Sequence, residues 1–351
     1  MKDGKLSRRA FIQNTSLMAA GTVVGALGGK GAASRKSGRG VDTSKILNYN
    51  PDMEYRRLGK TDLMVSAVCI GGHWKRVDVM KQDFAQNRYD VLSRCIEVGI
   101  NYVDACWNSE VKVYAKALKG RRDKFYLAMC HGSKGPRNKD WRTAKKLMEG
   151  LDELLRETKL EYTDLWRITC LEPGGRHTFN TAYEIAGALE KAKKQGKARF
   201  IGFSTHDRRW TKFMIEYFPQ IEVAVFPYTA RSKRLPKDSV FDALKKCDVG
   251  AFGIKPFASN SLFKGSSAPG DPHAQEDDKR ARLAIRYILC NPYVVPIPGL
   301  ISPHQVDNVA KAVMERRQLD VTEAKELEQA MDETWANLPA NYQWLKDWEY
   351  V

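Results

Sequence analysis

The sequence lacks the cysteine pairs that would indicate a metal ribbon or a ferredoxin-type cluster. Its seven cysteines are dispersed, and none forms a C-x-x-C pair. An odd, scattered set is also unlike the disulfide framework of a small secreted domain. Beyond the first 40 residues there is no run of the roughly 18 apolar residues that a membrane span needs. We therefore expect no iron–sulfur cluster and, once a leader has been cleaved, no stable membrane span.

Basic runs interleaved with aromatic residues are missing too, although the net charge is +16. Residues 1–40 hold eight Lys and Arg against the single acidic Asp3, so seven of those charges belong to the leader. The remaining charge, about +9, is spread over roughly 310 residues, mostly in stretches that also carry Glu and Asp. This distribution favours a solvated surface and predicts no nucleic-acid partner.

The first 40 residues have the composition of an export signal. Arg8-Arg9 are followed by Phe11-Ile12, an apolar stretch over 16–28 and small residues at 31–33. The arginine pair resembles a bacterial twin-arginine signal, which implies the twin-arginine export machinery as a partner. Residues 30–41 are rich in Gly, Ser and basic residues, like a flexible linker. We expect an exported, periplasmic protein, or a membrane-tethered one if the leader is retained.

Short apolar runs then alternate with amphipathic stretches from Val65 onward. The eight strand candidates are Val65–Gly72, Tyr102–Trp107, Phe125–His131, Asp164–Cys170, Arg199–Thr205, Val223–Tyr228, Val249–Phe257 and Val294–Leu300. Their near-continuous apolar character suits parallel strands buried on both faces. The turn after the first run lacks the G-x-G-x-x-G of a doubly wound sheet. We predict an α/β fold, a (β/α)8 TIM barrel over residues 50–320, followed by a C-terminal helix and aromatic tail over 321–351.

Helix limits are also readable from the sequence. The expected helices run over 88–98 (ending at Gly99), 109–120 (capped by Ser109), 140–158 and 181–195. The third places four leucines on one face, at positions 147, 151, 154 and 155. Because barrel enzymes place their chemistry at the C-terminal ends of the strands, candidate groups lie just after each strand.

Five segments in order resemble the aldo/keto reductase superfamily, between about Met53 and Val313. They are Glu54–Thr61 with Val65-Ser66, Gly99–Asp104, Ile201–Ser204, Lys255-Pro256-Phe257, and Ile297-Pro298-Gly299 with Gln305. The resemblance implies an N-terminal β-hairpin before the barrel. Ser204-Thr205-His206 and Lys255-Pro256-Phe257 are most similar to a bacterial subgroup that often carries an iron–sulfur tail, whose cysteines this chain lacks.

Members of this family reduce carbonyls with bound NADPH, using an Asp, a Tyr, a Lys and a His. Matched strand by strand, Asp104 occupies the aspartate position, Cys130 the lysine position and Thr169 the histidine position. The stretch 105–110 is about three residues shorter than the family's and has no tyrosine. The catalytic candidates are therefore Asp104, Cys130 and Thr169, with Asn108 and His131 beside them, in a degenerate tetrad.

The resemblance also implies a nicotinamide cofactor, NADP or NAD. Its candidate contacts are Gly72, Ser204, Thr205, Lys255, Pro256, Phe257, Gly299, Gln305 and Asn308. Leu300-Ile301 stands where a basic residue often binds the 2′-phosphate, so the sequence does not choose between the two dinucleotides.

The replaced positions allow several interpretations. Alternation along a strand places Asp104 and Cys106 on one face, and Cys130 should face the same space. With His73 or His131 they could form a metal site or a reactive thiol, or the two cysteines could form a disulfide after export. The interpretation we favour is that both cysteines are small apolar fillers of the space vacated by Tyr and Lys. Asp104 needs a buried partner, for which Lys255 is the candidate, and that ion pair could be structural or catalytic.

Three function classes remain. The favoured one is an oxidoreductase that acts on a small carbonyl, alcohol or sugar substrate with a bound nicotinamide cofactor. The alternatives are a non-redox enzyme that reuses the barrel mouth, with a metal or a reactive thiol, and a ligand-binding pseudoenzyme. Trp74 and Trp107 could stack on a substrate or cover the core.

Overall fold

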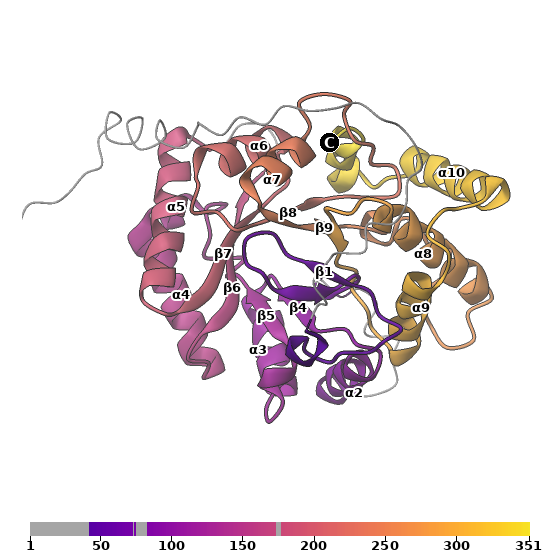
Figure 1. Ribbon diagram of the computed structural model, residues 1–351, viewed down its shortest axis with the longest axis horizontal. Coiled ribbons are helices and arrows are strands. Elements are labelled where there is room, and N and C mark those ends of the chain that lie inside the picture. The colour runs from indigo at the N-terminus through magenta and orange to yellow at the C-terminus, as the bar shows by residue number, and fades with distance from the viewer. Residues whose placement is uncertain (1–41, 73, 75–82, 173–176) are drawn as a thin grey trace, which may run out of the picture. The chain divides into compact units, whose positions relative to one another are not determined.

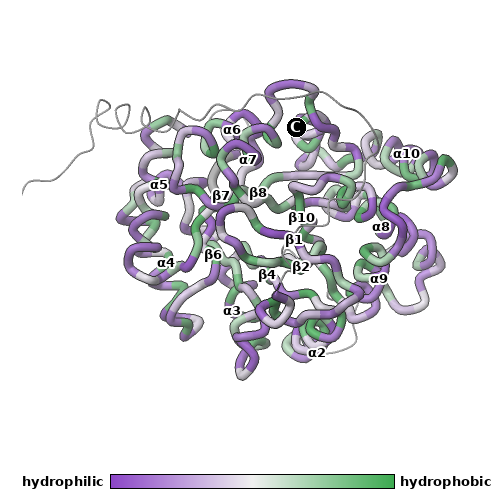
Figure 2. The backbone as a smooth tube through the Cα atoms, in the orientation of Figure 1, coloured by the Kyte–Doolittle hydropathy of each residue, from purple (hydrophilic) through white to green (hydrophobic). Residues whose placement is uncertain are grey.

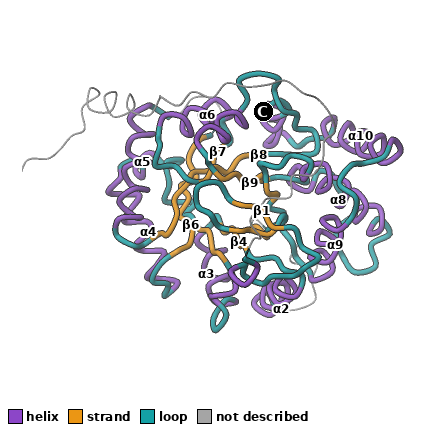
Figure 3. The backbone as a smooth tube through the Cα atoms, viewed as in Figure 1, coloured by secondary structure: helices purple, strands orange, loops and turns teal. Residues whose placement is uncertain are grey.

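Eight parallel strands form the centre of the protein in a computed structural model, which describes residues 42–72, 74, 83–172 and 177–351 (Figures 1 and 3). The strands are β3 (Ile70–Gly71), β4 (Tyr102–Ala105), β5 (Tyr126–Met129), β6 (Thr163–Leu171), β7 (Ala198–Thr205), β8 (Val223–Pro227), β9 (Gly250–Ile254) and β10 (Val295–Pro296). Neighbours in sequence are neighbours in the sheet. The Gly71 amide donates to Pro298 O at 2.8 Å and the Cys69 amide to Pro296 O at 3.0 Å, which joins β3 to β10 and closes the barrel.

A helix follows each barrel strand and packs outside it (Figure 1). These helices are α2 (Phe84–Glu97), α3 (Asn108–Ala117), α4 (Ala144–Thr158), α5 (Phe179–Lys194), α6 (Arg208–Tyr217), α7 (Val240–Cys247), α8 (Ala274–Leu289) and α9 (Pro303–Met314). The chain ends with α10 (Val321–Ala336) and a 3-10 helix (Ala340–Trp348). The (β/α)8 prediction is confirmed. No helix of the described residues is long and apolar enough to cross a membrane.

An antiparallel hairpin, β1 (Tyr55–Arg57) and β2 (Met64–Ser66), covers the N-terminal end of the barrel. Its turn approaches the start of β9, where Gly59 bridges to Val249 with a φ of +49°. A Cβ on Gly59 would lie 2.2 Å from the Gly250 nitrogen, so this contact requires glycine. The hairpin implied by the resemblance is confirmed, and the barrel is closed at this end.

The predicted first strand, 65–72, is wrong as one element. Residues 65 and 66 pair in the hairpin, and only Ile70–Gly71 joins the barrel. The apolar run is continuous in both parts because each packs inside the barrel or beside it. Hydrophobicity alone therefore could not show where the chain turns between the two sheets.

Two apolar cores share the sheet. One fills the space between strands and helices, and the other fills the barrel interior, where Leu58 and Leu63 of the hairpin turn join Tyr102 and Phe252. Along the helices, green and purple alternate in Figure 2, as expected for helices with one buried side. The four leucines predicted to face inward from α4 are buried, with at most 7% of each exposed.

The starts of all four expected helices differ from prediction because of their caps, and α5 begins two residues early because Thr178 caps it. Asp83 caps α2, accepting hydrogen bonds from the amides of residues 85 and 86, so this helix starts before residue 88. Thr143 caps α4, and residues 139–141 form a separate 3-10 turn. Ser109 does not cap α3, which begins at Asn108 and receives its cap from the Glu110 side chain instead. Each cap satisfies amides that the first helical turn leaves without partners.

The aromatic tail packs partly against the barrel. Trp348 is fully buried and donates its indole N–H to His206 O at 3.0 Å, while Trp344 stacks on the His206 ring. Tyr350, two residues further on, is half exposed. The tail therefore reaches the residues that follow β7, at the C-terminal end of the barrel.

Candidate active site

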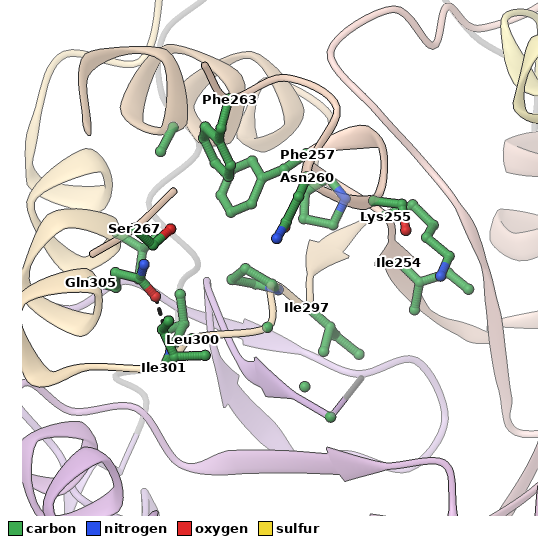
Figure 4. Close-up of a pocket in the computed structure, with 18 of the residues that line it drawn as sticks. Ile254, Lys255, Phe257, Asn260, Phe263, Ser267, Ile297, Leu300, Ile301 and Gln305 are labelled. Carbon is green, nitrogen blue, oxygen red and sulfur yellow. Dashed lines mark hydrogen bonds between the residues drawn. The ribbon is translucent and has the colours of Figure 1, made fainter. Parts of the chain in front are cut away.

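A cavity of about 470 Å³ opens at the C-terminal ends of the strands. Its lining combines strand ends from β3, β4, β6, β7, β9 and β10 with residues 256–271 and parts of α8 and α9. In Figure 4 Phe257, Asn260 and Phe263 lie on one side, and Leu300 and Ile301 lie opposite. The size and the mixed lining are those of a small-molecule site.

A buried ion pair lies at the base of this cavity. Arg167 Nε donates to Asp104 Oδ2 at 2.8 Å, and Nη2 donates to Oδ1, so the guanidinium holds the carboxylate with two parallel bonds. Each residue has only 3% of its surface exposed. Desolvation acts to lower the pKa of Arg167, but the Asp104 carboxylate outweighs it and raises that pKa well above its usual value. Burial also raises the pKa of the Asp104 carboxyl, while Arg167 acts to lower it, and the two parallel hydrogen bonds from the guanidinium favour the ionised carboxylate.

The expectation that Lys255 pairs with Asp104 is wrong, because Arg167 supplies the positive charge from β6. The sequence contained a signal for this partner. Arg167 lies in the middle of β6 between the apolar Trp166 and Ile168, and it precedes Thr169 by two residues, which places the Arg167 and Thr169 side chains on the same face. A cation inside a parallel strand needs a buried anion, and Asp104 is the anion that the barrel brings next to it.

Two cysteines and a threonine complete the base. We use the name floor for five residues at the base of the cavity: Asp104, Cys106, Cys130, Arg167 and Thr169. Arg167 Nη1 donates to Thr169 Oγ1 at 2.8 Å, and the Cys130 thiol lies 2.9 Å from the same oxygen. Cys106 Sγ is 3.4 Å from Cys130 Sγ, and neither thiol is in a disulfide.

The floor residues differ in their access to the cavity. Asp104, Cys106, Arg167 and Thr169 line it, whereas Cys130, 1% exposed, lies beneath them. Burial raises the pKa of the Cys130 thiol well above its usual value. Asp104 and Thr169 thus meet at the cavity as predicted, and Cys130 contacts both Cys106 and Thr169 without reaching the cavity itself.

Glu110 sets the position of Cys106. Its Oε2 atom accepts hydrogen bonds from the amides of Cys106 and Trp107 at 2.8 and 3.0 Å. A Cβ on Gly72 would lie only 2.2 Å from this carboxylate oxygen, so Gly72 leaves room for it. The short connection between β4 and α3 is therefore fixed by a buried acid, 6% exposed, at the start of the helix.

His131 and Asn108, also predicted as catalytic, do not line the cavity. His131 Nδ1 accepts a hydrogen bond from the Lys134 amide at 3.3 Å, and Nε2 lies 4.0 Å from Glu153 of α4. Burial lowers the pKa of this imidazole. Within residues 42–72, 74, 83–172 and 177–351, no three His, Cys, Asp or Glu side chains form a group able to hold a metal ion. His73 lies outside those ranges.

Most of the predicted cofactor contacts do line the cavity, and their role stays a prediction. Those on its wall are Gly72, Ser204, Lys255, Pro256, Phe257, Gly299, Gln305 and Asn308. Gln305 Oε1 accepts a hydrogen bond from the Ile301 amide at 2.8 Å (Figure 4). Thr205 is not part of the wall: its hydroxyl donates to Asp207 O at 3.0 Å and accepts from the Asp207 amide at 2.9 Å.

The opposite side of the cavity is built from loop backbone. We call residues 255–278 and 302–308 the outer wall. Lys255, Ala258, Ser259 and Asn260 have φ between +46° and +73°, in the left-handed region that side chains other than glycine rarely adopt. Such residues persist only where the surroundings hold them, and they gather at functional sites.

Two aspartates hold the outer wall through backbone amides. Asp277 accepts from the amides of Lys264 and Gly265, both at 2.8 Å. Asp271 accepts from the amides of Ser266 at 2.6 Å and His273 at 2.8 Å, and with the Ser266 hydroxyl these bonds lower the pKa of Asp271 to about 2. Sequence reasoning missed this segment, although its Ser, Pro, Gly and Asp content at 266–272 is typical of turns.

Rings and charges border the mouth. His206 stacks on Trp344 with ring centroids 4.1 Å apart, and its Nδ1 lies 3.4 Å from Glu172 Oε2. Burial lowers the pKa of His206 despite that carboxylate, which also pairs with Arg137. Trp74 packs edge-on against Phe84 and Tyr114, so it covers the core there.

The family model described as "Aldo/keto reductase family" matches residues 69–332. The chain is 25% identical over 256 residues to an L-glyceraldehyde 3-phosphate reductase of Escherichia coli O157:H7, covering 66% of this chain and 68% of that protein. It is 25% identical over 295 residues to an L-galactose dehydrogenase of Arabidopsis thaliana, covering 76% and 90%.

Solved structures share the fold. An aldo-keto reductase from Bacillus halodurans in its holo form gives a TM-score of 0.60 at 22% identity, covering 79% of this chain and 96% of that one. An aldo-keto reductase from Klebsiella pneumoniae in complex with NADPH gives 0.61 at 19% identity, covering 79% and 94%. At these identities the likeness concerns the barrel.

Proposed function

The chain belongs to the aldo/keto reductase family, and from this premise we propose that it is an oxidoreductase interconverting a small carbonyl compound or sugar with its alcohol by means of a bound nicotinamide cofactor. The observation that carries the proposal is the charged Asp104–Arg167 pair at the base of the cavity, beside the hydroxyl of Thr169 and the thiol of Cys106. This base offers a fixed positive charge and two protic groups to a carbonyl oxygen.

The wall residues suit a dinucleotide. Ser302 caps α9 at the cavity, and the amides and dipole of a helix N-terminus favour a pyrophosphate. The left-handed backbone over 258–260 is of the kind that directs successive amides toward an anion. Ser204, 3% exposed, can bond a carboxamide. Once bound there, NADP or NAD would supply or accept the hydride.

The catalytic groups depart from the usual tetrad. None of the described cavity residues is a tyrosine, and Lys255 is the only lysine among them. We infer that Arg167, held by Asp104, provides the charge that stabilises the developing alkoxide. Thr169 Oγ1 accepts from Arg167 and lies 2.9 Å from Cys130 Sγ, so its hydrogen must turn from that sulfur toward the cavity to bond the substrate oxygen.

We assign the proton to the Cys106 thiol. Cys106 is the thiol of the floor that lines the cavity, and a thiol gives up its proton more readily than the Thr169 hydroxyl. In reduction the hydride adds to the carbonyl carbon and the Cys106 proton passes to the oxygen. The thiolate, which the positive charge of Arg167 favours, is then reprotonated through the mouth. Oxidation of an alcohol reverses these steps.

Binding and turnover test the proposal separately. NADPH and NADH are titrated into the purified protein by fluorescence, and oxidation of each is followed with small aldehydes, ketones and sugars. Saturable binding of one dinucleotide with turnover of at least one carbonyl is expected. Arg167→Met should keep the binding and lose the turnover. Absence of binding for both dinucleotides would overturn the redox function, and binding without turnover would favour the pseudoenzyme.

We further propose that residues 1–40 direct the folded, loaded protein to the periplasm. The support is the arrangement of Arg8-Arg9, the apolar stretch and the small residues that follow it. Replacement of both arginines with lysine should leave the protein in the cytoplasm, as measured by cell fractionation. Unchanged export of that variant would contradict the twin-arginine route.

A further inference from the structure

We propose that Cys106 and Cys130 form an oxidisable dithiol, which a peroxide entering the cavity converts into a disulfide between β4 and β5. The loss of the two thiols inactivates the site, and reduction restores it. The chemical class of the oxidant is a hydroperoxide small enough to reach the floor. The inactivation rests on the proposed function, whereas the disulfide itself does not.

Strand register brings the two residues together. Ala105 pairs with Met129, so Cys106 and Cys130 are the next pair along adjacent parallel strands. The Cys130 amide donates to Ala105 O at 3.1 Å and the Gly132 amide donates to Cys106 O at 3.0 Å, which continues the pairing past the end of β5. Neighbouring strands are about 4.8 Å apart, within the Cα separation of known disulfides.

The sulfur atoms are already close. They lie 3.4 Å apart, and a disulfide bond of about 2.05 Å requires them to approach by roughly 1.4 Å more. Both residues stand where the regular strands end, since β4 stops at Ala105 and β5 at Met129. Hydrogen bonds hold both backbones there, so a rotation of the two side chains is the movement that closes the gap.

Access and charge set the order of events. Cys106 lines the cavity and is 8% exposed, whereas Cys130 is 1% exposed beneath it, so peroxide reaches Cys106 first. Arg167 Nη1 is 3.6 Å from Cys130 Sγ, which places a guanidinium beside the second sulfur. Burial raises the pKa of the Cys130 thiol, and the guanidinium acts against this effect of burial, toward the thiolate that the second step needs.

The chemistry balances with peroxide as the sole oxidant. The Cys106 thiolate attacks one peroxide oxygen, an S–O bond forms, the O–O bond breaks and, with hydrogen peroxide, one water leaves. The Cys130 thiolate then attacks the Cys106 sulfur, the S–S bond forms, the S–O bond breaks and a second water leaves. Two thiols and one hydrogen peroxide thus become one disulfide and two waters.

Oxidation would change the floor around the substrate. The Cys130 thiol donates to Cys106 O at 2.8 Å and lies 2.9 Å from Thr169 Oγ1, and both interactions depend on the thiol. The disulfide removes the Cys106 proton that the proposed reaction uses, and it takes a bonding partner from Thr169. If the cysteines were only apolar fillers, neither oxidation nor its reversal would alter turnover.

The test uses the purified full chain, treated with hydrogen peroxide and then alkylated after unfolding. We expect loss of two alkylatable thiols, a peptide linking Cys106 to Cys130 by mass spectrometry, and at least a tenfold fall in turnover that dithiothreitol reverses. The control is Cys290→Ser, since Cys290 is exposed and lies away from the floor; it should behave like the parent.

Each variant is compared with its own untreated sample. Cys130→Ser should form no such peptide, and excess peroxide should inactivate it irreversibly, because the sulfenic acid on Cys106 is then oxidised further. Cys106→Ser should also form no such peptide, and it replaces Cys130→Ser if that variant does not fold. A disulfide that joins other cysteines, or two thiols that stay alkylatable, would overturn the dithiol. A Cys106–Cys130 disulfide with unchanged turnover would overturn the inactivation. A peroxide-treated protein that shows the disulfide yet never turned over any carbonyl leaves the dithiol standing and refutes the redox function instead.

Discussion

The floor and the outer wall enclose the same cavity but are built in different ways. Floor residues come from three adjacent strands, β4, β5 and β6, and their side chains bond mainly to one another. In the outer wall, aspartate side chains hold loop amides that lie within about a dozen residues along the chain. The groups assigned to the reaction are therefore fixed by the barrel, whereas the surface assigned to the dinucleotide depends on local loop contacts.

The largest effect should follow from breaking the floor's ion pair. Arg167→Met leaves Asp104 as an unpaired buried carboxylate, and we expect the free energy of unfolding to fall by about 3–5 kcal/mol in urea denaturation. The double variant Asp104→Leu/Arg167→Met should recover most of that loss, because no buried charge remains. As a control, Lys279→Ala removes an exposed ion pair with Glu326 and should cost less than about 1 kcal/mol. If Arg167→Met and Lys279→Ala lowered the free energy of unfolding equally, the buried ion pair of the floor would be no more important for stability than a surface pair.

A second effect should appear in catalysis alone. Thr169→Val keeps the volume of the side chain but removes the hydroxyl, so one donor to the developing alkoxide is lost. We expect kcat to fall by about 10²-fold, with the affinity for dinucleotide unchanged. Steady-state kinetics and fluorescence titration separate the two. If only the affinity for dinucleotide changed, Thr169 would have a role in cofactor binding and not in the reaction.

The outer wall should show the opposite pattern. Asp277→Ala removes the acceptor for two loop amides, and we expect a threefold to tenfold weaker affinity for dinucleotide, a small change in kcat and a loss of about 1–2 kcal/mol in unfolding. Asp347→Ala, at an exposed site outside the cavity, is the matched control. If Asp277→Ala lowered kcat as strongly as Thr169→Val, the two regions would not be functionally separable.

The smallest expected effect is a change in amide hydrogen exchange of the outer wall at low pH. Because the folded pKa of Asp271, about 2, lies below its usual 3.8, its stabilising bonds are complete above pH 3.8 and are lost as the pH falls through about 2. Loop amides at 266 and 273 should therefore exchange with solvent faster relative to floor amides in that interval. Hydrogen exchange measured by mass spectrometry checks this, and Asp271→Ala, which lacks the acceptor, should show fast exchange at every pH. Equal acceleration of floor and loop amides would indicate general unfolding instead.

The barrel was predictable because strand and helix periodicities are local. The run containing Asp104, for example, is apolar on both faces and ends where the structure ends it, within two residues. The partner of Asp104 was missed, because Lys255 follows β9 whereas Arg167 lies in the middle of β6, and only the register of β4, β5 and β6 brings Arg167 beside Asp104. The outer wall was least predictable. A glycine often marks a left-handed position in a sequence, but here such positions are occupied by other residues, such as Lys255 and Ala258.

The stacked rings of His206 and Trp344 give the mouth of the cavity an intrinsic fluorescent reporter. An imidazole in contact with an indole quenches its fluorescence, and the quenching strengthens when the imidazole takes up a proton. With the centroids 4.1 Å apart, any molecule that parts or polarises this pair on its way into the cavity changes the emission of Trp344. The chain has eight tryptophans, so the difference between the parent and Trp344→Phe isolates that signal. The intrinsic fluorescence of Trp344 thus reports the entry of an unlabelled substrate.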